Sequence, residues 1–135
     1  MTALLLDSSV VLAAINPNDP NSEAAHRILF EEELDLTSID LIRYEIANVT
    51  SAAWREPEKT PSVLAIAELL GGHDGLRRSD TPMLVAASEV ATEYSISTYD
   101  AAYVVAARSS GRTLVSCDER DLVAKGLAVL PADAL

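Results

Sequence analysis

Two acidic residues follow stretches of the sequence that are typical of buried strands. Asp7 comes directly after Leu4-Leu5-Leu6, and Asp118 stands shortly after Leu114 and Val115. A carboxylate beside a buried strand is costly unless it has a partner. In open α/β sheets, ligands bind beyond the carboxyl ends of the strands, at the point where the strand order reverses. If the two strands are neighbours, both carboxylates face one crevice.

Two further acids can join this crevice. Glu45 lies in an otherwise apolar helical pattern, and Asp100 lies in the first turn of the helix predicted after "SISTY". Carboxylates that converge repel one another and raise their own pKa values, unless a cation neutralises them. Hard oxygen ligands favour Mg²⁺ or Mn²⁺ over zinc. The four acids together therefore predict a divalent metal site.

Each of these acids also has a purely structural interpretation. Asp118 can cap a short helix, with Asp121 three positions later in a first turn that favours negative charge. Asp100 can be stabilised by the dipole of its own helix, and Glu45 can point to solvent. Asp7 is the hardest to explain in this way, because the serines that follow it already supply a cap for the next helix.

Other candidate ligands are scarce. His26 and His73 are isolated and are interpreted as surface residues, and the single cysteine, Cys117, excludes an internal disulfide. A free thiol is typical of a reducing compartment, and no stretch is typical of a signal peptide or a membrane span. We therefore expect a single cytoplasmic domain over residues 1–135, a length sufficient to bury a core.

The charge of the chain is strongly acidic. It has 10 Lys and Arg against 21 Asp and Glu, a formal net charge of −11. Phosphate contacts need basic residues, so any surface that binds nucleic acid must be a small basic region of this acidic chain. The candidate residues are Arg43, Arg77, Arg78 and Arg108. The run "FEEELD" is interpreted as a solvated helix face, or alternatively as a surface for a basic partner.

Strand-like and helix-like segments alternate along the chain. This order predicts a mostly parallel sheet with helices on both faces, a three-layer α/β/α sandwich. Residues 74–80 contain at most a short edge strand. The expected strands are 4–6, 34–38, 113–117 and 127–130, and the expected helices are 8–15, 22–33, 38–54, 62–70, 82–94, 97–110 and 118–126.

Four segments, read in order, resemble a known family. The stretches "LLLDSS", "RYEIANV", "TYDAAYVVAA" and "LVSCDERDL" are similar to the PIN domain, and most closely to VapC-type toxins of bacterial and archaeal toxin–antitoxin pairs. The likeness covers nearly the whole chain. It implies a metal-dependent endoribonuclease that hydrolyses RNA phosphodiester bonds and leaves a 5′-phosphate, with one or two metal ions.

The resemblance also implies roles for individual residues. The catalytic acids and ligands of Mg²⁺ or Mn²⁺ would be Asp7, Glu45, Asp100 and Asp118, with Asp121 as a possible further ligand. Ser116 would hydrogen-bond the last acid. Ser9 and Asn48 are weaker candidates for contact with metal or substrate.

The same resemblance implies two protein partners: a homodimer, and an antitoxin whose tail covers the acids with a Lys or Arg. Two other functions stay open on the residues alone. One is a non-catalytic PIN-like module that binds protein, although all four acids are intact. The other is a phosphoacceptor or phosphatase with Asp7 as nucleophile, which is disfavoured because Ser9 stands where a second Asp is expected.

Overall fold

The computed structural model describes residues 2–135, and a three-stranded parallel sheet lies at its centre. The strands run in the order β2–β1–β3, where β1 is Ala3–Leu6, β2 is Asp35–Thr37 and β3 is Thr113–Val115. Leu5 of β1 pairs with Thr37 on one side and with Leu114 on the other. The leucines of β1 are buried because this central strand is covered on both faces.

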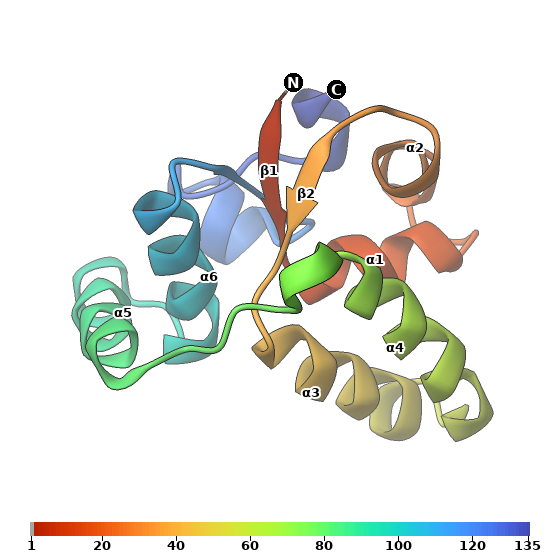
Figure 1. Cartoon of the computed structure of the whole chain (residues 1–135), viewed down its shortest axis with the longest axis horizontal. Helices are drawn as coiled ribbons and strands as arrows, with labels where there is room; N and C mark the ends of the chain where they lie inside the picture. Colours follow the sequence, from red (N-terminus) through yellow and green to blue (C-terminus); the bar gives the residue numbers. More distant parts are fainter. Residues whose placement is uncertain (1) are drawn as a thin grey trace.

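Helices cover the sheet from two sides (Figure 1). On one side α6 packs on β1 and β3, and α5 packs against α6; on the other side α1 packs on β1 and α2 packs against α1. The predicted α/β/α sandwich with a parallel sheet is confirmed. The helices are α1 (Ser8–Ile15), α2 (Ser22–Phe30), α3 (Leu41–Asn48), α4 (Thr60–Leu69), α5 (Thr81–Tyr94) and α6 (Thr98–Ser109).

The strand order reverses beside β1. The chain passes from β1 to β2 on one side and later returns to form β3 on the other. The backbone N–H of Asp7 donates to the carbonyl of Val115 at 3.3 Å, so pairing of β1 with β3 continues past the end of β1. The strands that precede Asp7 and Asp118 are therefore neighbours, and their carboxyl ends open at the switch point where such folds bind ligands.

The third helix begins later than the sequence indicates. Ser38 was expected to start it, but Ser38 is buried and its hydroxyl donates to the carbonyl of Leu6 at 2.7 Å. The helix starts at Leu41 and continues beyond Asn48 as a π-helical turn over Val49–Ala53. Ser38 thus holds the chain after β2 against the end of β1 before α3 departs.

One expected strand, and the segment expected to hold at most a short edge strand, each form a single bridge. Residues 127–130 do not form a strand: Val129 makes one parallel bridge with Val115, and Pro131 follows closely and has no N–H to extend the pairing. In residues 74–80, only Arg77 bridges, to Ile39. The segment after Asp118 is a π-helical turn over Glu119–Val123.

No helix within residues 2–135 is both long enough and apolar enough to cross a membrane.

Candidate active site

The four predicted acids converge at the carboxyl ends of β1 and β3. Asp7 caps α1, and Asp118 caps the turn that follows β3. Glu45 comes from α3 and Asp100 from the first turn of α6. The charge of Glu45 influences the titration of both Asp7 and Asp100, which places the carboxylates in one electrostatic neighbourhood.

Asp7 is the most buried of the four acids, with only 5% of its surface exposed. Its Oδ1 atom accepts hydrogen bonds from the backbone N–H of Ser9, at 3.0 Å, and from the Ser9 hydroxyl. Burial raises the pKa of Asp7 to about 6; hydrogen bonding from Ser116 and Ser9 opposes the rise, and the charges of Glu45 and Asp100 add to it. A carboxylate in this setting is stabilised by a nearby cation.

Ser9 and Ser116 join the ends of the two strands. While it donates to Asp7, the Ser9 hydroxyl accepts the backbone N–H of Cys117 at 2.9 Å. The Ser116 hydroxyl lies 3.5 Å from that of Ser9 and accepts the backbone N–H of Asp118 at 3.0 Å. The predicted bond from Ser116 to the last acid is therefore present, through the backbone of Asp118, and Ser9 supports Asp7.

The tightest acidic group consists of Asp100, Asp118 and Asp121. One carboxylate oxygen from each lies within 4.8 Å of the other two. The pKa of Asp100 is raised, first by burial of its carboxyl group and then by the negative charges of Asp118 and Glu45. Asp121, expected only as an auxiliary acid, is thus one of the three members of this group.

Local hydrogen bonds fix the turns that carry this group. The hydroxyl of Ser97 accepts the backbone N–H of Asp100, and Oδ1 of Asp118 accepts the backbone N–H of Asp121, each at 3.0 Å. Asp118 is therefore a helix cap and a member of the cluster at once. The structural interpretation of this residue and the functional one do not exclude each other.

Glu45 points into the molecule and not to solvent. The hydroxyls of Tyr103 and Ser8 both donate to its Oε1 atom, at 2.6 and 3.1 Å. Burial and the charge of Glu45 raise the pKa of Tyr103, so its phenol stays protonated and able to donate. Sequence reasoning missed both hydroxyls. One signal was available, since Tyr103 lies three residues after Asp100 and helical spacing brings such pairs to one face.

Asn48, the other weak candidate, is exposed at the end of α3. His26 and His73 are exposed as predicted, and His26 lies 3.8 Å from Glu31. The donors of the cluster are all carboxylate oxygens. This set, half-buried and mutually repelling, suits a hard divalent cation such as Mg²⁺ or Mn²⁺.

The arginines suggested by the sequence mostly have other contacts. Arg43 lies 3.7 Å from Glu68, Arg77 donates to Ser109, and Arg108 stacks on the ring of Tyr94. Within residues 2–135, Arg120 is the one basic side chain that pairs with an acid of the cluster, at 3.3 Å from Asp121. Its side chain is 89% exposed, so this ion pair is weak and another anion can replace Asp121 as the partner of Arg120.

Solved structures share this architecture. VapC20 of Mycobacterium tuberculosis, described as a toxin that cleaves the sarcin–ricin loop, is 17% identical with a TM-score of 0.70, covering 92% of this chain and 95% of its own. The toxin–antitoxin complex of Klebsiella pneumoniae contains a chain that is 13% identical, with a TM-score of 0.67 and coverage of 96% and 98%. PAE2754 of Pyrobaculum aerophilum is 26% identical, with a TM-score of 0.59 and coverage of 98% and 92%.

Sequence comparison gives the family directly. No curated protein sequence matches the chain significantly. The family model of the PIN domain, however, matches residues 4–126, which include all four predicted acids and Asp121. The expected resemblance is confirmed, and the chain belongs to the PIN-domain family.

Proposed function

We propose that the chain is a single nuclease domain of the VapC type, a metal-dependent endoribonuclease that hydrolyses RNA phosphodiester bonds. The observation that carries this proposal is the convergence of four acids from separate elements at the switch point beside β1, in a chain of the PIN-domain family. The likeness to VapC20, which is described as cleaving the sarcin–ricin loop, supports RNA as the substrate.

Mg²⁺ or Mn²⁺ would be held by Asp7, Glu45, Asp100 and Asp118, and Asp121 is a possible further ligand because its carboxylate lies in the tight group. Bound there, the ion would lower the pKa of a water molecule and stabilise negative charge on the phosphoryl oxygens. The protein itself orients the carboxylates: Ser9 holds Asp7, and Ser97 holds the backbone that carries Asp100.

The proposal includes a cognate antitoxin. The Klebsiella pneumoniae neighbour was solved as a toxin–antitoxin complex. The net charge of −11 and the exposed acids Glu31, Glu32 and Glu33 favour a basic partner. We expect a Lys or Arg of the antitoxin tail to pair with the acidic cluster and so block metal and RNA. The free thiol of Cys117 is consistent with a reducing cytoplasm.

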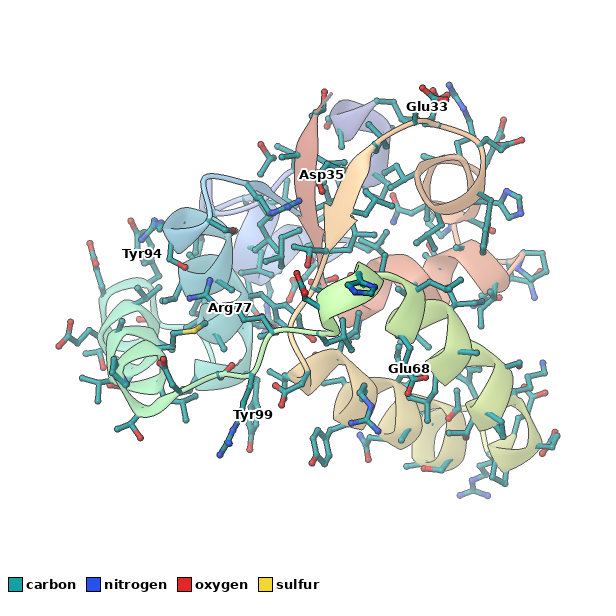
Figure 2. All side chains as sticks on the ribbon, in the orientation of Figure 1. Glu33, Asp35, Glu68, Arg77, Tyr94 and Tyr99 are labelled. Atoms are coloured by element: carbon teal, nitrogen blue, oxygen red, sulfur yellow. The ribbon has the colours of Figure 1, made fainter. Side chains whose placement is uncertain are left out.

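A homodimer is also proposed, through an apolar face of α3, α5 and α6. Tyr44, Leu84 and Tyr99 line a hollow of about 450 Å³ there and are 71%, 46% and 64% exposed. Figure 2 shows Tyr99 projecting outward from the start of α6, between α5 and α3. Exposed apolar patches of this kind are typical of protein interfaces.

Cleavage of a mixed RNA pool tests the function. Purified protein should cut the pool at discrete positions in Mg²⁺, and the cuts should disappear in EDTA and in the Asp7→Asn variant. Cuts that persist in Asp7→Asn would place the activity elsewhere. If Mg²⁺ gives neither cleavage nor a higher melting temperature, the non-catalytic binding module becomes the better account.

A further inference from the structure

The carboxylate of Glu45 is held at one of its two oxygens. Tyr103 and Ser8 both donate to Oε1, at 2.6 and 3.1 Å, and no described residue of the chain donates to Oε2. Hydrogen bonds to a charged acceptor are about twice as strong as neutral ones. Two such bonds on one atom restrict the rotation of the carboxylate and leave its second oxygen available.

The two donors come from different elements. Tyr103 lies on α6, three residues after Asp100, and Ser8 is the first residue of α1, next to Asp7. Each donor is therefore attached to the backbone that carries another acid of the site. Through these bonds the placement of Glu45 on α3 depends on the helices that carry Asp7 and Asp100.

Burial fixes the position of the Tyr103 hydroxyl. Tyr103 is only 1% exposed, and a buried phenol needs a partner for its O–H group. The packing of Tyr103 has little freedom, so the position of its hydroxyl dictates where Glu45 can lie. Ser8 is half-buried and its hydroxyl completes the pair.

We propose that Tyr103 and Ser8 are positioning residues, which orient the Glu45 carboxylate so that Oε2 is presented to a divalent cation. This inference rests on the metal site of the proposed function and does not depend on RNA as the substrate. Hydrogen-bond partners of metal ligands typically change metal affinity by about 10- to 100-fold when they are removed. We expect losses in the lower part of that range, because the carboxylate itself remains.

The test is the dissociation constant for Mn²⁺, measured by isothermal titration calorimetry on the full chain without RNA. We expect Tyr103→Phe to raise this constant about 10-fold and Ser8→Ala to raise it less, because its bond is longer. Tyr94→Phe is the matched control, since it removes the hydroxyl of a tyrosine on α5 whose ring meets Arg108 and not Glu45, and it should leave the constant unchanged.

A double-mutant cycle separates positioning from a merely structural role. In a Glu45→Gln background, Tyr103→Phe should cause little further loss of Mn²⁺ affinity, because the group that it orients is no longer a ligand. Melting temperatures in EDTA check the fold. If Tyr103→Phe does not fold, Ser8→Ala with Glu45→Gln gives the same cycle at a more exposed position.

Equal Mn²⁺ affinity in the wild type and in Tyr103→Phe would overturn the inference, and so would an equal loss with and without Glu45→Gln. Mn²⁺ binding by the wild type without RNA cleavage would contradict the proposed nuclease and leave the positioning role standing. Absence of Mn²⁺ binding in the wild type would overturn both.

Discussion

The hydroxyl of Ser9 accepts the backbone N–H of Cys117 at 2.9 Å while it donates its own proton to the buried carboxylate of Asp7. One side chain thus ties the end of β1 to the segment that leads from β3 to Asp118. The distance between the first and the last acid of the site depends on this bond.

Removal of this hydroxyl should weaken both stability and activity. Ser9→Ala leaves Asp7 with one donor fewer and the Cys117 amide without its partner, a cost of about 1–3 kcal/mol in the free energy of unfolding. Urea denaturation checks this value. Ser62→Ala is the control, because it removes an exposed hydroxyl that bonds only to the backbone of Lys59. Equal effects of the two substitutions would contradict the role given to Ser9.

The buried carboxylate of Asp7 predicts an unusual dependence of stability on pH. Its pKa is about 6 in the folded chain against an ordinary value of 3.8. Between these values the folded state binds more protons than the unfolded state, so the contribution of Asp7 to stability falls as the pH rises through this window. The loss is complete above the folded pKa and amounts to about 3 kcal/mol at most.

Asp7→Asn should therefore be more stable than the wild type at pH 7.5 in EDTA, while being inactive. Asn can still cap α1 and accept the hydrogen bonds of Ser9. The gain should shrink as the pH falls from about 6 toward about 4, and an exposed acid substituted as a control, Asp133→Asn, should show no such trend. If Asp7→Asn is less stable than the wild type at every pH, the claim that the buried charge of Asp7 destabilises the folded chain is wrong.

Asp121 should matter more than its neighbour in the same turn. Its carboxylate lies in the tight group with Asp100 and Asp118, whereas Glu119 is exposed. We expect Asp121→Asn to weaken Mn²⁺ binding about 10-fold and Glu119→Gln to leave it nearly unchanged. Calorimetric titration with Mn²⁺ compares the two variants. Equal Mn²⁺ affinities of Asp121→Asn and Glu119→Gln would show that Asp121 is not a metal ligand.

Arg120 is expected to contact the RNA backbone. Among the described residues, it is the one basic side chain that pairs with the acidic group of Asp100, Asp118 and Asp121. Because this side chain is exposed, it can leave Asp121 and bind a phosphate instead. Arg120→Gln should raise the KM for RNA and lower the slope of log affinity against log salt by about one. Arg27→Gln, which breaks a surface pair between Arg27 of α2 and Glu32, is the control and should change neither value. An unchanged salt slope would exclude a phosphate contact.

The proposed dimer depends on the apolar face of α3, α5 and α6. A charge at Leu84 should separate the protomers, because it would be buried without a partner. Light scattering after size-exclusion chromatography should then give the monomer mass for Leu84→Asp and the dimer mass for the wild type. Phe30→Asp, at an exposed apolar residue of α2, should remain dimeric. A monomeric wild type at micromolar concentration would contradict this interface.

Much of the site was predictable because strand and helix patterns are local. Leu4 to Leu6 identify a buried strand, Asp7 marks its end, and helical spacing places Glu45 and Asp100 on their helices. The spacing of Asp100 and Tyr103 indicates that both lie on one face of α6, but the bond from Tyr103 to Glu45 was not predictable, since the two residues are 58 positions apart in sequence and the bond depends on how α3 and α6 pack. Residues 127–130 have the composition of a strand, but Pro131 stops their pairing after one bridge.

The most direct test of the central claim compares single-turnover cleavage of one mapped RNA by the wild type, Asp118→Asn and Asp133→Asn. Asn preserves the cap at position 118, so the variant should fold, while the loss of a charged ligand should lower the Mg²⁺-dependent rate by at least about 100-fold. Asp133→Asn should cleave at the wild-type rate. If Asp118→Asn folds and cleaves as fast as the wild type, the acids at the ends of β1 and β3 are not the catalytic site.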